Sequence, residues 1–160
     1  MIFINGIKLN KKGGKSMKIE FYELGKVDEE NLKFAVMASV YQEKWIYVRE
    51  EQRETWEIPG GHRDVGEGID DTAKRELFEE TGAKEFNLST ICDYSIQDYS
   101  MNNSNDKSYG RLFFSQVREI GDLPISEIIE IMLFDGLPEN LTYPELNSLM
   151  YKKKIGRAHV

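Results

Sequence analysis

Residues 61–83 constrain this chain more than any other part of its sequence. The segment reads GHRDVGEGIDDTAKRELFEETGA: a glycine, five residues, a glutamate, seven residues, and then Arg-Glu-Leu-Phe-Glu-Glu-Thr-Gly-Ala. Local signals predict a helix over Ile69–Thr81, because Asp70 and Asp71 suit the positive end of a helix dipole and Gly82 is a typical helix stop.

Three glutamates of this helix, Glu76, Glu79 and Glu80, have the spacing i, i+3 and i+4. That spacing places their carboxylates on one face, where like charges repel. Two interpretations follow: a solvated acidic face, which the helix alone favours, or a site for a hard divalent cation such as Mg²⁺ or Mn²⁺, which takes oxygen ligands.

The residues before the helix favour the second interpretation. The run Trp-Glu-Ile-Pro-Gly-Gly, residues 56–61, predicts a short strand that enters a tight turn at Gly60 and Gly61. The chain then passes through Glu67 and Gly68 into the acidic helix. A glycine-rich loop that leads into a helix is a common way to build a phosphate and metal site, and the joint spacing is what makes the pattern specific.

With these residues, the segment resembles the Nudix box, and residues 17–153 more loosely resemble a Nudix hydrolase domain. The resemblance implies an α/β fold, namely an α/β/α sandwich with a mixed sheet and the box as loop-helix-loop. It also implies hydrolysis of a nucleoside diphosphate linked to a further moiety X. A metal ion would neutralise phosphate charge and lower the pKa of the attacking water, so no nucleophilic side chain is required.

The resemblance also implies roles for single residues. Mg²⁺, or Mn²⁺ in its place, would be bound by Glu76, Glu79, Glu80 and the carbonyl of Gly60. The structural positions of the box would be Gly61, Glu67, Arg75 and Gly82, with Glu67 and Arg75 as an ion pair that braces the loop.

Members of the family differ in the residue that acts as the catalytic base, so Glu76 and Glu79 both remain candidates. Many relatives add an acid from a loop before a late strand, and Glu127 is the best-placed candidate for that acid here. Glu119 and Asp106 are the next candidates. A solvated loop acid is the alternative interpretation of Glu127.

The substrate is less constrained than the reaction. The small size and the early box resemble bacterial MutT-type members, which hydrolyse nucleoside triphosphates such as 8-oxo-dGTP. Tyr99, 16 residues past the box, matches a position where diadenosine polyphosphate hydrolases often carry tyrosine. A dinucleoside polyphosphate or ADP-ribose hydrolase is therefore an alternative, and a silent nucleotide-sensing module is another, although the intact glutamates disfavour it.

Candidate substrate contacts are Arg49, Arg53, His62 and Tyr99. Aromatic residues that either stack on a nucleobase or belong to the core are Phe34, Tyr47, Trp56 and Tyr109.

Composition agrees with one small domain: 160 residues, 40% of them hydrophobic, are enough for a single core. The net charge of −7 argues against binding of long nucleic acid. No apolar run is long enough to span a membrane. Cys92 is the one cysteine, which fits a reducing cytoplasm, and we expect a half-buried thiol there. A monomer and a homodimer are both compatible with the sequence.

The sequences at the two ends of the chain resemble translated non-coding DNA. Residues 1–16 match a translated ribosome-binding leader, which would make Met17 the native start, and residues 155–160 match a translated sequencing adapter. We therefore expect a single domain over 17–153. Without those two ends the charge would be 16 − 28, or −12, because they carry five of the 21 positive charges and no negative one.

Alternation of apolar and polar residues predicts strands over residues 18–24, 34–41, 45–49, 86–96, 111–117 and 128–134. A closing helix is expected over 143–153. The polar loop 101–107 is expected either to close over a ligand or to be merely mobile.

Overall fold

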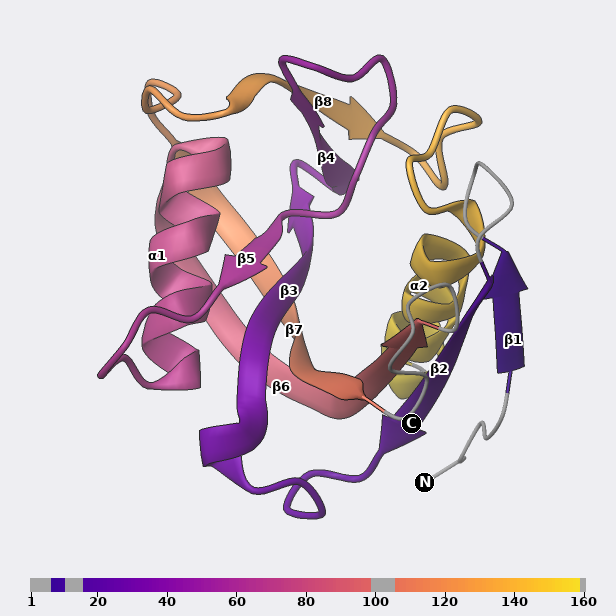
Figure 1. Cartoon of the computed structure of the whole chain (residues 1–160). Coiled ribbons are helices and arrows are strands. Elements are labelled where there is room, and N and C mark those ends of the chain that lie inside the picture. The colour runs from indigo at the N-terminus through magenta and orange to yellow at the C-terminus, as the bar shows by residue number, and fades with distance from the viewer. Residues whose placement is uncertain (1–6, 11–15, 99–105, 159–160) are drawn as a thin grey trace.

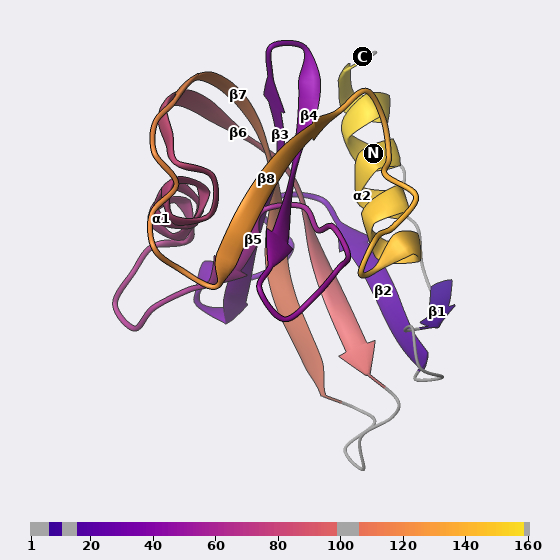
Figure 2. The same cartoon turned by 90° about the horizontal axis from the view of Figure 1, so that it is seen from above.

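One mixed sheet lies between two helices in the computed structural model, which describes residues 7–10, 16–98 and 106–158 (Figures 1 and 2). The helices are α1 (Ile69–Thr81) and α2 (Pro144–Ala158), with a short 3-10 helix η1 (Glu29–Asn31). The strands are β1 (Ile7–Asn10), β2 (Ser16–Tyr22), β3 (Leu32–Tyr41), β4 (Lys44–Glu50), β5 (Gly60–His62), β6 (Ala83–Asp98), β7 (Lys107–Ile120) and β8 (Ile128–Phe134).

The strand order is β1-β2-β6-β7-β3-β4-β8, and the short β5 pairs with β3 beside this path. Strands β3 and β7 are parallel and the remaining pairs are antiparallel. Helices α1 and α2 cover opposite faces (Figure 2). The predicted α/β/α sandwich with a mixed sheet is therefore confirmed. No helix in the described ranges is long and apolar enough to cross a membrane.

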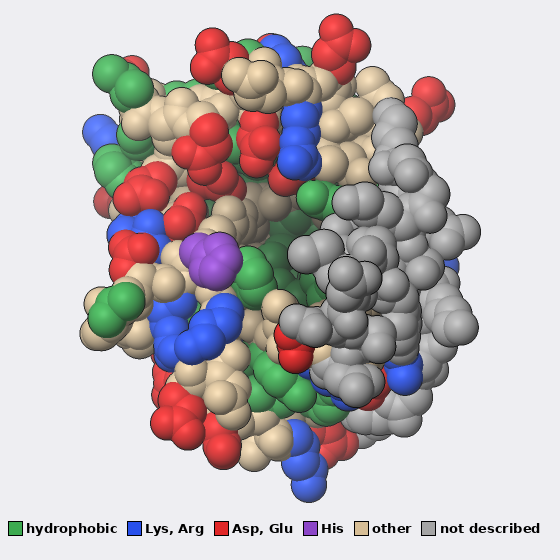
Figure 3. Space-filling model, in the orientation of Figure 1, with side chains coloured by type: hydrophobic (Ala, Val, Ile, Leu, Met, Phe, Trp, Pro, Cys, Tyr) green, Lys and Arg blue, Asp and Glu red, His purple; other side chains and the backbone are tan. Residues whose placement is uncertain are grey.

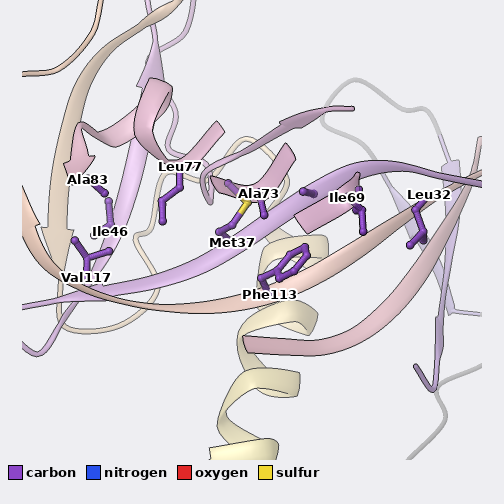
Figure 4. Close-up of a cluster of buried hydrophobic side chains, with 10 residues drawn as sticks. Leu32, Met37, Ile46, Ile69, Ala73, Leu77, Ala83, Phe113 and Val117 are labelled. Carbon is purple, nitrogen blue, oxygen red and sulfur yellow. The ribbon is translucent and has the colours of Figure 1, made fainter. Parts of the chain in front are cut away.

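The hydrophobic core is divided by the sheet into two clusters. Under α1, Ile69, Ala73 and Leu77 pack on Met37 and Phe113 of the sheet, all of them fully or almost fully buried (Figure 4). Burial of a side chain such as Leu77 contributes roughly 1.5–3 kcal/mol to stability. The second cluster includes Phe21, Leu112 and Met150, which join α2 to the other face. The contacts under α1 fix this helix, and with it the acidic face, against β3 and β7.

Helix α1 has the bounds that the sequence predicts. Asp70 and Asp71 lie in its first turn, and Gly82 ends it in the left-handed conformation, with φ of 76° and its N–H bonded to the carbonyl of Phe78 at 2.8 Å. A side chain at Gly82 would also collide with the backbone of Gly121 and Asp122. Glycine is therefore required there for both conformation and space.

Three expectations were wrong in detail. Gly60 and Gly61 do not form a tight turn: they lie in β5, because their backbone pairs with Val36 and Ala35 of β3. Trp56 and Glu57 form isolated bridges instead of a strand. Cys92 is fully buried, since it belongs to the core cluster under α2.

The ends of the chain contain structure that was not expected. Strand β1 lies within residues 1–16 and pairs with β2, and α2 continues to Ala158. The origin of both ends stays a prediction. Tyr99 and most of the loop 101–107 lie outside the described residues.

Candidate active site

Glu80 anchors the acidic face of α1 to strand β5. Its Oε1 accepts a hydrogen bond of 2.8 Å from the backbone N–H of Gly60. Glu80 is only 6% exposed, whereas the side chains of Glu76 and Glu79 are 12% and 45% exposed. The three carboxylates therefore run from the protein interior to the solvent along one helix face.

Gly61 leaves the space that the Glu76 carboxylate occupies. A Cβ built on Gly61 would overlap the carboxyl carbon and both oxygens of Glu76. Gly60 is equally confined on its other side, where a Cβ would lie 2.7 Å from the carbonyl oxygen of Ala35. The Gly-Gly pair thus allows close approach between β5 and its neighbours α1 and β3.

Arg75 joins the loop to the helix. Its Nε and Nη2 donate to the two oxygens of Glu67 at 2.7 and 3.0 Å, and Nη2 also donates to the carbonyl of His62 at 2.8 Å. Its Nη1 donates to Glu76 at 2.8 Å and Glu79 at 3.1 Å. One guanidinium therefore connects Glu67 at the end of the loop, His62 of β5 and the acidic face.

The same geometry separates the pKa values of the acids. Burial, the largest cause, raises the pKa of Glu80 to about 8; the Gly60 N–H opposes this effect. Burial also raises the pKa of Glu76, although Arg75 acts in the opposite direction. The hydrogen bonds from Arg75, followed by those from Thr72, lower the pKa of Glu67 to about 2. A negative charge is therefore unfavourable on the buried Glu80 and Glu76 and favourable on Glu67 in the loop.

Glu127 lies in the loop that precedes β8, and its charge contributes to the raised pKa of both Glu76 and Glu80. The side chain is exposed, and its backbone carbonyl accepts a hydrogen bond of 2.9 Å from the N–H of Glu51. The fold therefore brings this distant loop within electrostatic range of the helix face.

The two arginines expected to contact substrate hold partners within the protein. Arg49 donates to Glu130 at 3.1 Å and to the carbonyl of Arg53 at 3.0 Å. Arg53 pairs with Glu57 at 2.8 Å and Glu50 at 3.2 Å. Either guanidinium would have to exchange these bonds for a phosphate.

His62 lies at the rim of a hollow beside the acidic side chains (Figure 3). The floor of the hollow is hydrophobic in the same view. The imidazole contacts the ring of Phe34, with 4.3 Å between the ring centroids. His62 is exposed and Phe34 is half-buried.

The family model of the NUDIX domain matches residues 31–146. The chain belongs to the Nudix family. It is accordingly a hydrolase of the family that acts on pyrophosphate bonds of nucleotides, and members of this family generally use a divalent metal ion. No sequence among the curated proteins matches the chain.

Solved structures share this Nudix fold at low identity. A mutant form of the Bacillus subtilis pyrophosphohydrolase BsRppH is 19% identical with a TM-score of 0.75, and the match covers 94% of this chain and 97% of that one. A UDP-X diphosphatase is 22% identical with a TM-score of 0.62, covering 79% and 64%. A Caenorhabditis elegans Ap4A hydrolase is 17% identical with a TM-score of 0.59, covering 80% and 100%.

Sequence reasoning on this Nudix domain missed Glu57. Its side chain is 20% exposed, its charge raises the pKa of Glu80, and its own pKa is raised, first by burial and then by Glu50. Glu57 stands three residues before Gly60, so its place in the run before the glycines was the available signal.

The donor set of this Nudix site fits a divalent cation, although the described side chains do not converge on one point as a ready cage of three ligands. Arg75 holds Glu76 and Glu79, so its guanidinium supplies the positive charge near them. The buried carboxylate of Glu80, whose pKa is raised, accepts a hydrogen bond from the backbone N–H of Gly60. A cation would compensate that buried charge, and carboxylate oxygen is a suitable ligand for Mg²⁺.

Proposed function

We propose that the chain is a MutT-like nucleoside triphosphate pyrophosphohydrolase that uses Mg²⁺, with 8-oxo-dGTP as a candidate substrate. The observation that carries the proposal is the buried Glu80 carboxylate, bonded to Gly60 on the same helix face as Glu76 and Glu79. Support for the substrate class comes from the fold shared with a bacterial pyrophosphohydrolase over 94% of the chain.

The ligands of the metal would be Glu76, Glu79, Glu80 and the carbonyl of Gly60. When bound, a divalent ion would neutralise phosphate charge and lower the pKa of a water molecule. The Glu67–Arg75 pair would hold the loop in register with the helix, so that the ligands keep their positions. Mn²⁺ is the expected substitute, because it takes similar ligands.

The reaction would form a bond between a water oxygen and the α-phosphorus while the bond from that phosphorus to the bridging oxygen breaks. The products would be a nucleoside monophosphate and pyrophosphate. We assign the water's proton to Glu127, whose exposed side chain acts electrostatically on Glu76 and Glu80. Glu76 and Glu79 are the alternative bases, but both already accept hydrogen bonds from Arg75.

Substrate contacts are proposed for Arg49, Arg53, His62 and Tyr99. The alternative substrates are dinucleoside polyphosphates, as the name of the nematode neighbour suggests, and ADP-ribose, as for the Streptococcus suis ADP-ribose pyrophosphatase, which is 20% identical with a TM-score of 0.56, covering 78% of this chain and 90% of that one. A monomer or homodimer in the cytoplasm, acting on small nucleotides and not on long nucleic acid, completes the proposal.

The test is product release from dNTPs, 8-oxo-dGTP, ADP-ribose and diadenosine polyphosphates with Mg²⁺, Mn²⁺ or EDTA. We expect metal-dependent pyrophosphate and monophosphate from a triphosphate. Glu79→Gln and Glu80→Gln should each reduce kcat by several orders of magnitude in folded protein. Full metal-dependent turnover in both variants would contradict the assignment, and a folded, metal-binding protein with no turnover would favour a silent sensing module.

A further inference from the structure

Phe34 is a half-buried aromatic residue that belongs to neither core cluster of the described residues. Other aromatic side chains of the sheet pack with one another or against the core, such as Trp45 with Phe114 and Tyr47 with Phe134. The ring partner of Phe34 is instead the exposed His62. The pair is therefore not explained by core packing.

Strand pairing fixes where these two rings lie. Phe34 of β3 is opposite His62 of β5, and Gly110 of β7 is opposite Phe34 on its other side. Side chains alternate along a strand, so His62 points away from the face on which Gly61 meets Glu76. Phe34 and His62 thus lie on the same face of the sheet as Val36, across the edge of β5 from the acidic helix.

Strand β5 connects the acidic face to the rings, because Gly60 in this strand donates a hydrogen bond to Glu80 and His62 lies in the same strand. His62 follows Gly60 by two residues, which in an extended strand span about 7 Å. Figure 3 shows His62 at the rim of the hollow, with acidic side chains on the same rim and hydrophobic side chains on the floor. A nucleotide whose phosphates lie at the acidic face would carry its base toward this hollow.

We propose that Phe34 and His62 form the surface on which the nucleobase of the substrate stacks. The inference rests on the proposed function, and it makes the His62 side chain a base contact instead of a phosphate contact. Every nucleobase has an aromatic face, so this surface adds affinity for nucleotides as a class over the phosphate chain alone.

Binding measurements with two ligands test this inference without relying on turnover. The ligands are a nucleoside triphosphate analogue with non-hydrolysable methylene bridges and inorganic tripolyphosphate, each titrated with Mg²⁺ into the full chain. Phe34→Ala and His62→Ala should each weaken binding of the analogue about tenfold and leave the affinity for tripolyphosphate unchanged. Phe34→Trp and His62→Phe should retain analogue affinity, because they keep an aromatic face.

Two controls separate stacking from damage to the fold. Phe86→Ala removes a partly buried aromatic residue that packs under α1, and it should lower stability without changing either affinity. His62→Ala changes an exposed side chain, so it remains informative if Phe34→Ala fails to fold.

The opposite results would overturn the inference. If His62→Ala loses affinity for both ligands equally, His62 is a phosphate contact. If both alanine variants keep wild-type affinity for the analogue, the two rings are not a stacking surface. Failure of the proposed function is a separate result, because wild-type protein would then hydrolyse no triphosphate while base-dependent binding is still measured.

Discussion

The backbone N–H of Gly60 donates a 2.8 Å hydrogen bond to Oε1 of Glu80, a carboxylate that is almost fully buried. One hydrogen bond does not offset the loss of hydration, so the pKa of Glu80 rises from its ordinary 4.5 to about 8. The residue that the acidic face buries most deeply is therefore also the one that most requires a positive partner.

This burial predicts that the metal-free protein loses stability as the pH rises. Between pH 4.5 and about 8 the folded state keeps a proton on Glu80 that the unfolded state has released. The free energy of unfolding should then fall by up to about 1.4 kcal/mol per pH unit over this window, and Glu76 and Glu57, whose pKa values are also raised, act in the same direction.

Urea unfolding in EDTA across that window measures the slope. Glu80→Gln should flatten it, whereas Glu79→Gln, which changes the most exposed of the three glutamates, should leave it largely intact. Mg²⁺ should stabilise the wild type more at the alkaline end. An identical slope in wild type and Glu80→Gln would show that the Glu80 carboxyl is not the cause.

Gly61→Ala is predicted to abolish activity without unfolding the protein. The added methyl group would take the place of the Glu76 carboxylate, which must then leave its position on the helix face. Gly68→Ala is the matched control, because a Cβ there would meet Asp71 at an ordinary 3.4 Å. Kinetics with circular dichroism distinguish the two, and an active Gly61→Ala would show that Glu76 need not occupy this place.

Local signals predicted α1 well because its start and stop depend on neighbours in the sequence. Asp70 and Asp71 meet the helix dipole at one end, and the left-handed Gly82 ends the helix at the other. The face shared by the glutamates follows from helix geometry alone. These parts of the site were readable without any knowledge of the sheet.

Contacts between distant strands were not readable in this way. Gly60 and Gly61 have the composition of a turn, and only the pairing with β3 makes them a strand. The same pairing brings His62 to Phe34, and the path of the chain before β8 brings Glu127 toward Glu80. Such contacts depend on tertiary packing that a local pattern does not encode.

Arg75→Lys is predicted to lower both stability and activity. A lysine ammonium cannot reproduce the paired bonds to Glu67 together with those to Glu76 and His62. The loop would lose its fixed position relative to the helix. Thermal unfolding and kcat measure the two effects. Arg63→Lys is the comparison, since the Arg63 guanidinium donates to the backbone carbonyls of Glu29 and Glu30 in η1, away from the box glutamates. Wild-type kcat in Arg75→Lys would mean that the brace is dispensable.

Glu127→Gln tests the proposed base. The carboxylate lies in a loop, exposed, and acts on Glu76 and Glu80 through its charge, so its removal should leave the fold intact. We expect kcat to fall by about 10²–10⁴-fold, the usual contribution of a general base, with little change in KM.

Glu119→Gln is the control. Glu119 is also exposed, but it lies opposite Glu85 in the strand pairing of β6 and β7. If kcat in Glu127→Gln matches the wild type, the proton must pass to Glu76 or Glu79, and Glu127 is then a solvated loop acid.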